Sequence, residues 1–216
     1  MKYTMSNYKI LDNVLTENTI NCLYDMINDE YFPWYFTKSI FNRKIKVDKD
    51  TLANNITYSP GFHHTPFSLE SGWQSSLPII DNMKTILNEF AAFENITIDR
   101  LLRVRIRKTL QFPTHKKDNH NMPHTDFPNE QKYYSLIYYP EDTDGDTVFF
   151  KGNKQSKEYS NMINSINGEL VRVQPKKGRF IFFDGSVIHS GNNPISYNKR
   201  VVVNYDFTIK ETEYLW

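Results

Sequence analysis

The second half of the chain consists of short β-rich runs separated by turn residues. Each run combines β-branched and aromatic side chains, and the runs cover residues 96–110, 132–140, 146–152, 168–175, 178–185 and 200–209. No helix-length periodic segment separates them, as it would in βαβ units, so the rhythm favours a sandwich or jelly roll. We therefore expect a mainly β core over residues 96–216.

Two segments before this core have the 3.6-residue period of amphipathic helices. Residues 15–29 begin with Thr16 as a candidate N-cap and place Ile20, Leu23 and Met26 or Ile27 on one stripe. Residues 76–93 begin with Ser76 as a candidate cap and Pro78 in the first turn. The apolar stripe of this second helix is Leu77, Ile80, Met83, Leu87 and Phe90.

The totals limit the class of protein. At 216 residues the chain suits one core, so we expect a single domain over residues 1–216, with residues 1–95 as a helical and loop support region. Its 26 basic and 25 acidic side chains give a net charge of +1, which makes a nucleic-acid partner unlikely. The lone Cys22 and the lack of a long apolar run predict a soluble, cytoplasmic protein without a membrane partner.

A histidine and a carboxylate, His124 and Asp126, stand two residues apart at the entrance to a β run. Residues i and i+2 of a strand project to the same face, so both can reach one metal ion. His189 ends another β run and is a candidate third ligand. Two histidines and one carboxylate are the ligand set of non-haem Fe(II) oxygenases. Such pairs are also common on protein surfaces, and the same three ligands would suit Zn²⁺.

Arg200 lies eleven residues beyond His189, at the start of the last β run. A guanidinium there can hold a carboxylate through two hydrogen bonds, although an exposed arginine is the plainer reading. Lys199 is the neighbouring alternative. Because alternate residues of a strand share a face, Arg200 shares its face with Asn204, which suits a polar cavity, and we choose Arg200.

Four motifs in this order resemble the Fe(II)- and 2-oxoglutarate-dependent oxygenase superfamily, in its prolyl 4-hydroxylase-like branch. They span roughly the last half of the chain: HTD at 124–126, YSLIYY at 134–139, DGDTVFF at 144–150, and the segment 175–207 that contains His189 and Arg200. The resemblance implies a double-stranded β-helix (jelly-roll) core whose N-terminal helices pack on one sheet.

Carried over position by position, the resemblance makes His124, Asp126 and His189 the iron ligands. It makes Arg200 the partner of the distal carboxylate of 2-oxoglutarate and places Tyr139 at a position where related enzymes bind the same carboxylate; a packed strand aromatic is an equal alternative. Two residues depart from the family pattern: Asp146 replaces the second glycine of a Gly-Gly-x-Thr turn, and Val202 stands where a serine is frequent.

The implied function is that of a 2-oxoglutarate-dependent dioxygenase with Fe(II) as cofactor and 2-oxoglutarate and dioxygen as co-substrates. It would hydroxylate a C–H bond and release succinate and CO2. A peptidyl proline is one candidate substrate, and other peptides and small molecules remain candidates. The alternatives are a non-catalytic metal-binding jelly-roll module and an oxygenase acting on nucleobases. The sequence carries no signal for the oligomeric state.

Three further features bear on the site. Arg103, Arg105 and Arg107 alternate with apolar residues, so they belong either to a solvated outer edge or to the wall of the pocket, where Arg105 would contact 2-oxoglutarate or an acidic substrate. Residues 59–73, with Phe62, His63, His64 and Trp73, are expected to form a flexible substrate lid. His115 and His120 lie in a loop, where spare histidines are usually solvated.

Overall fold

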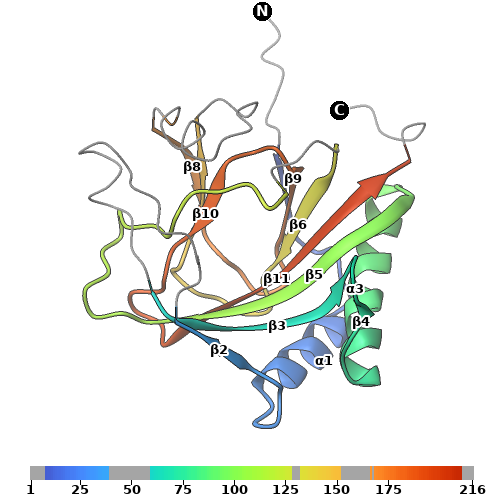
Figure 1. Ribbon diagram of the computed structural model, residues 1–216. Coiled ribbons are helices and arrows are strands. Elements are labelled where there is room, and N and C mark those ends of the chain that lie inside the picture. Colours follow the sequence, from blue (N-terminus) through green and yellow to red (C-terminus); the bar gives the residue numbers. More distant parts are fainter. Residues whose placement is uncertain (1–7, 39–58, 128–131, 152–165, 167, 211–216) are drawn as a thin grey trace, which may run out of the picture.

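The computed structural model describes residues 8–38, 59–127, 132–151, 166 and 168–210, and these form two antiparallel sheets and two helices (Figure 1). The larger sheet has the strand order β1-β9-β6-β11-β5-β3-β2, in which β3 is Gly61–Ser68, with β4 (Gly72–Trp73) paired to β3. The smaller sheet has the order β10-β7-β8. This is the jelly-roll architecture with flanking helices that the sequence predicted.

All six predicted β runs are strands. They correspond to β5 (Ile98–Leu110), β6 (Tyr134–Tyr138), β7 (Thr147–Phe150), β8 (Glu169–Val173), β9 (Phe180–Asp184) and β11 (Lys199–Ile209). The sequence did not reveal the short strands at β1 (Tyr8–Leu11), β2 (Tyr35–Thr37) and β10 (His189–Gly191). Each of these three strands is short, and its pairing depends on the longer neighbours rather than on a pattern of its own.

The two predicted helices are α1 (Glu17–Asn28) and α3 (Leu77–Glu94). Thr16 caps α1, its side chain accepting a hydrogen bond from the backbone N–H of Thr19, whereas the Ser76 side chain makes no such bond. Leu77 was wrongly placed on the buried stripe of α3: it is 73% exposed. Both helices end in a backbone cap: the N–H of Asp29 donates to the carbonyl oxygen of Met26, and the N–H of Asn95, which has left-handed backbone angles, donates to those of Ala91 and Ala92.

Both helices cover the outer face of the larger sheet (Figure 1). The helices contribute Leu23, Ile27, Met83, Ile86 and Phe90 to one buried cluster with Val104, Ile106, Phe182, Val203 and Phe207 of the sheet. Burial of this apolar surface fixes which side chains of β5 and β11 face the helices. Alternate residues of the same strands must therefore face the opposite way, toward the smaller sheet.

A second apolar cluster lies between the two sheets. It consists of Ile137, Tyr139, Phe149, Val173, Ile181, Phe183, Val187 and Val202. The cluster closes one part of the space between the sheets and leaves the polar ends of β5, β7, β10 and β11 around a cavity. The fold thus separates an apolar floor from a polar site.

Residues 59–73 are not the flexible lid that we expected. Gly61–Ser68 form β3, which pairs with β5 and β2, and Gly72–Trp73 form β4, which pairs with β3. Pairing on both sides explains the difference, because β3 sits inside the sheet with its backbone hydrogen bonds satisfied. The support region is accordingly richer in strands than a helical and loop segment. Neither described helix is long and apolar enough to cross a membrane.

Candidate metal centre

His124 and His189 are brought together by their own backbones. Each donates its backbone N–H to the carbonyl oxygen of the other at 2.9 Å, forming an isolated antiparallel bridge at the start of β10. Asp126 follows two residues after His124, and one ligand atom from each of the three side chains lies within 4.8 Å of the others. A direct backbone contact therefore brings together predicted ligands that are far apart in the sequence.

The hydrogen bonds of the two imidazoles select the tautomer that binds a metal. Nδ1 of His124 lies 3.0 Å from the carbonyl oxygen of Met122, and Nδ1 of His189 lies 3.0 Å from that of Val187. A carbonyl oxygen only accepts, so both Nδ1 atoms carry the proton and both Nε2 atoms keep a lone pair. The two Nε2 atoms lie 3.9 Å and 3.5 Å from carboxylate oxygens of Asp126. Burial and then the nearby His189 lower the pKa of His124 to about 3, so His124 is neutral.

Arg103 and Asn204 orient the carboxylate of Asp126. Arg103 Nη2 donates to Asp126 Oδ1 at 2.5 Å, and Asn204 Nδ2 donates to Asp126 Oδ2 at 3.2 Å. Burial alone would raise the pKa of Asp126, but the Arg103 guanidinium, with smaller contributions from His189 and His124, holds that pKa well below its usual range. Asp126 is therefore an anion at neutral pH and a suitable ligand for a divalent cation.

Asp206 supports Arg103 from the sheet. Its Oδ2 lies 2.8 Å from Arg103 Nη2, and its Oδ1 accepts a hydrogen bond from the hydroxyl of Ser135 at 2.8 Å. Asp206 is completely buried. Arg103 thus bridges two carboxylates, of which one can bind a metal while the other lies behind the guanidinium. Such outer partners fix the orientation of a ligand and affect metal affinity.

Arg200 points into the same cavity, as predicted, and is only 5% exposed. Its Nε donates to the carbonyl oxygen of Gly145 at 2.5 Å and its Nη2 donates to Thr147 Oγ1 at 2.8 Å. A side chain at Gly145 would place Cβ 2.6 Å from Arg200 Cδ, so the glycine makes room for the arginine. Lys199 faces the other way and pairs with Glu141.

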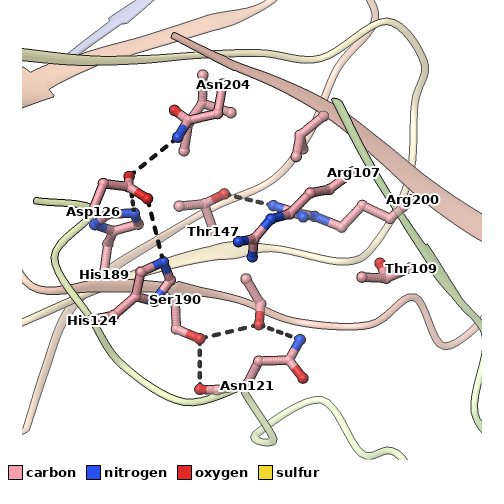
Figure 2. A pocket seen from close by; sticks show the side chains of 13 residues that line it. Arg107, Thr109, Asn121, His124, Asp126, Thr147, His189, Ser190, Arg200 and Asn204 are labelled. Carbon is pink, nitrogen blue, oxygen red and sulfur yellow. Dashed lines mark hydrogen bonds and ion pairs between the residues drawn. The ribbon is translucent and has the colours of Figure 1, made fainter. Parts of the chain in front are cut away.

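One cavity between the sheets is lined by both the three candidate metal ligands and Arg200. Figure 2 shows the three candidate ligands on one side, Arg200 on the other, and the guanidinium of Arg107 directed into the space between them. The wall also includes Thr109, Asn121, Ile137, Thr147, Ser190, Gly191, Val202 and Asn204. A small anion that reaches from the ligands to Arg200 would cross this space.

The other three residues predicted to contact 2-oxoglutarate differ in how they lie relative to the cavity. Tyr139 is fully buried and is not among the cavity-lining residues; its hydroxyl lies 2.5 Å from Thr147 Oγ1, which does line the cavity. Arg105 lies on the cavity face of β5 but outside the cavity wall, whereas Arg107 lies within it. Asn204 is in the wall, beside Asp126.

The arginines of β5 face the cavity side rather than a solvated edge. Val104 and Ile106 are buried in the cluster under the helices, so the residues between them project toward the smaller sheet. The solvated-edge alternative is therefore wrong. Sequence reasoning named Arg103 and Arg107 only as members of this pattern, because their contacts with Asp126 and the cavity depend on how β5 lies against the metal-ligand loop.

The spare histidines also lie differently from expectation. His115 and His120 are 6% and 2% exposed, so the prediction that they are solvated was wrong. The loop that carries them packs against β7 and β10, with His120 against the ring of Phe150 and the Asn121 N–H bonded to the carbonyl oxygen of Gly191. Neither belongs to the group of candidate ligands found among the described residues.

Comparison with known proteins identifies the fold. No protein-family model matches the sequence, and no curated protein does either. Among solved structures, the chain is similar to a 2OG-Fe(II) oxygenase family oxidoreductase from Burkholderia pseudomallei, with 12% identity, a TM-score of 0.60, and 94% of this chain and 85% of that chain covered.

Two further structures agree. A prolyl hydroxylase from Trichoplax adhaerens, solved with a hypoxia inducible factor peptide, has 14% identity and a TM-score of 0.58, with 93% of this chain and 83% of that chain covered. HygX from Streptomyces hygroscopicus, solved with nickel and 2-oxoglutarate, has 10% identity and a TM-score of 0.57, with 94% and 82% covered. The chain therefore has the fold of 2-oxoglutarate-dependent Fe(II) oxygenases, which confirms the predicted resemblance at the level of the fold.

Proposed function

We propose that this protein is an Fe(II)- and 2-oxoglutarate-dependent dioxygenase that hydroxylates a C–H bond of its substrate and releases succinate and CO2. The observation that carries the proposal is one cavity with two ends. Two Nε2 lone pairs and a carboxylate meet at one end, and the guanidinium of Arg200 lies at the other. The fold alone would not justify the assignment, because one fold can serve many functions.

The donor set fits Fe(II). His124, Asp126 and His189 offer two neutral nitrogens and one anionic oxygen, and a three-ligand face leaves further coordination positions open. When bound, Fe(II) with 2-oxoglutarate would supply the oxidising chemistry that the side chains lack. Arg103 would keep Asp126 ionised and correctly oriented for this role.

Arg200 would bind the distal carboxylate of 2-oxoglutarate. Its Nε donates to Gly145, its Nη2 donates to Thr147, and Tyr139 also bonds to the guanidinium, so part of its five N–H groups is left for a ligand. Thr147 Oγ1 presents a hydroxyl next to the guanidinium, and Tyr139 would act through Thr147 rather than by direct contact. The side chains of Ile137 and Val202 would exclude water along the chain of the co-substrate.

The proposal extends to the substrate only in outline. A peptidyl proline is one candidate, as the similarity to a prolyl hydroxylase suggests, and a small molecule is the other. We also propose that residues 1–216 work as a single domain, because α1, α3 and the large sheet share one apolar cluster.

The two alternatives have less support. A structural metal site usually has four protein ligands and no need of a buried guanidinium opposite the metal. A nucleobase oxygenase was suggested only by the arginines of β5 and the many aromatic residues. Of these arginines, Arg103 is accounted for by its bonds to Asp126 and Asp206.

The test is succinate formation from 2-oxoglutarate by protein supplied with Fe(II) and air, with and without candidate substrates. We expect succinate from the wild-type protein and none above background from His124→Ala. Lys199→Gln is the matched control, because Lys199 neighbours Arg200 on the opposite face of β11. Equal succinate formation by wild type and His124→Ala would overturn the proposal.

A further inference from the structure

The cavity face of the large sheet carries more positive than negative charge. Among the described residues, β5, β11 and the metal-ligand loop contribute four arginines and two aspartates to this side: Arg103, Arg105, Arg107, Arg200, Asp126 and Asp206. With every group charged, four positive charges minus two negative charges leave an excess of two. Burial and then the charge of Asp126 raise the pKa of Asp206 to about 7, so partial protonation of Asp206 adds to this excess. Bound Fe(II) and doubly charged 2-oxoglutarate cancel each other, so the excess persists in the loaded site.

The surroundings of three of the four arginines already suggest what each one does. Arg103 is paired with Asp126 and Asp206. Arg200 is held by Gly145 and Thr147 at the deep end. The guanidinium of Arg107 points into the space that 2-oxoglutarate would cross (Figure 2).

Arg105 is different, because the described part of the chain provides no direct partner for its Nε, and Asp126 and Asp206 stabilise its charge only from a distance. Its Nε is buried and has no hydrogen-bond partner among the described residues, and none of their carboxylates forms an ion pair with it. Burial and then the positive charge of Arg103 lower the pKa of Arg105 to about 10, so it is still a cation at neutral pH. A buried N–H of a cation without an acceptor is costly unless a ligand supplies one.

A second buried atom without a partner lies next to Arg105. Asn204 is the register partner of Arg105 on β11, and it lines the cavity. Its Nδ2 faces carboxylate oxygens of Asp126 and Asp206, which fixes the orientation of the amide, because an oxygen there would meet two acceptors. The Oδ1 of Asn204 is buried and has no hydrogen-bond partner among the described residues.

His63, on β3, lies beside these arginines. It is the register partner of Arg107, and burial followed by the charges of Arg105 and Arg107 lowers its pKa, so it is neutral at neutral pH. A neutral imidazole can donate one hydrogen bond to an anion without adding to the charge repulsion.

We propose that the substrate carries an anionic oxygen group, a carboxylate or a phosphate, and binds it at Arg105 beside the metal centre, with Asn204 Oδ1 accepting a hydrogen bond from a neighbouring N–H or O–H of the same molecule. This proposal rests on the proposed oxygenase function and narrows its substrate class to acidic molecules. Arg105 is then the residue that selects the substrate, whereas Arg200 selects the co-substrate.

The experiment is calorimetric titration of the protein loaded with Fe(II) and 2-oxoglutarate under nitrogen, so that the site around Arg200 is filled. The probes are two pairs of similar shape: propionate against propionamide, and dimethyl phosphate against trimethyl phosphate. We expect saturable binding of at least one acid, about ten-fold or more tighter than its neutral partner. The pair that shows the preference identifies the carboxylate or the phosphate as the natural group.

Variants then assign the preference to one side chain. Arg105→Gln should lose it, Arg105→Lys should keep part of it, and Arg100→Gln should keep all of it, because Arg100 is an exposed arginine of the same strand. The 2-oxoglutarate Kd of each variant, measured first, reports folding and the co-substrate site, and it should stay within about two-fold of wild type.

Three results would overturn the inference: no saturable binding of either acid, equal binding of acids and neutral partners, or equal weakening of acid probe and 2-oxoglutarate by Arg105→Gln. The last result would make Arg105 a co-substrate contact. Failure of the oxygenase proposal is seen separately, as absence of Fe(II)-dependent 2-oxoglutarate binding, and the acid preference at Arg105 is still decided by the same titration of Fe(II)-treated protein.

Discussion

Arg200 and Arg105 lie on the same face of one sheet, yet their surroundings differ. Arg200 is fixed by a backbone carbonyl and a threonine hydroxyl before any ligand arrives, and Gly145 leaves room for its side chain. Arg105 has a buried Nε for which the described residues supply no acceptor. A preorganised group suits a ligand that every turnover uses, because little entropy is lost on binding. An arginine whose Nε has no acceptor in the described part of the protein suits the substrate, which would supply that acceptor when it binds.

The largest expected effect comes from removing the fixed arginine. Arg200→Gln should weaken 2-oxoglutarate binding by about 3 kcal/mol, roughly 100-fold in Kd, because a charge-assisted two-point contact is lost from a buried site. Anaerobic calorimetry with Fe(II)-loaded protein measures it. Arg105→Gln is the contrasting variant, and a similar loss in both would remove the distinction between the two arginines.

Arg103 should affect the metal more than the co-substrate. Arg103→Gln removes the cation between Asp126 and Asp206, so the Fe(II) Kd should rise by roughly 30-fold, within the range found for outer partners of metal ligands. Titration of the metal without 2-oxoglutarate measures this change. Arg100→Gln, from the exposed end of β5, is the control. An unchanged Fe(II) Kd would mean that the bond from Arg103 to Asp126 does not contribute to metal affinity.

The smallest expected effect concerns the threonine beside Arg200. Thr147→Val keeps the shape but removes the hydroxyl that contacts Arg200 and Tyr139, so 2-oxoglutarate should bind about five-fold more weakly, the value of one hydrogen bond. Thr147→Ser keeps the hydroxyl and should stay close to wild type in the same titration. If serine and valine weaken binding equally, packing of the methyl group rather than the hydrogen bond orients Arg200.

The sequence predicted the features that depend on local periodicity. Alternation along β11 chose Arg200 over Lys199, and spacing placed His124 and Asp126 on one side. Helical period found α1 and α3.

Features that depend on register between distant segments were not visible. The bond between Arg103 and Asp126 joins β5 to the metal-ligand loop, and the position of Thr147 follows from how β7 faces β11. The strand β3 was mistaken for a lid because its order comes from pairing with β5 and β2 rather than from its own residues.

The central claim is that one co-substrate bridges a metal held by His124, Asp126 and His189 and the guanidinium of Arg200. Thermodynamic linkage tests this claim most directly: 2-oxoglutarate affinity is measured under nitrogen with and without Fe(II), in wild type and in Asp126→Ala. If one molecule contacts both ends, Fe(II) should tighten 2-oxoglutarate binding by about ten-fold or more in wild type and not in the variant. Equal 2-oxoglutarate affinity of the wild-type protein with and without Fe(II) would contradict the account.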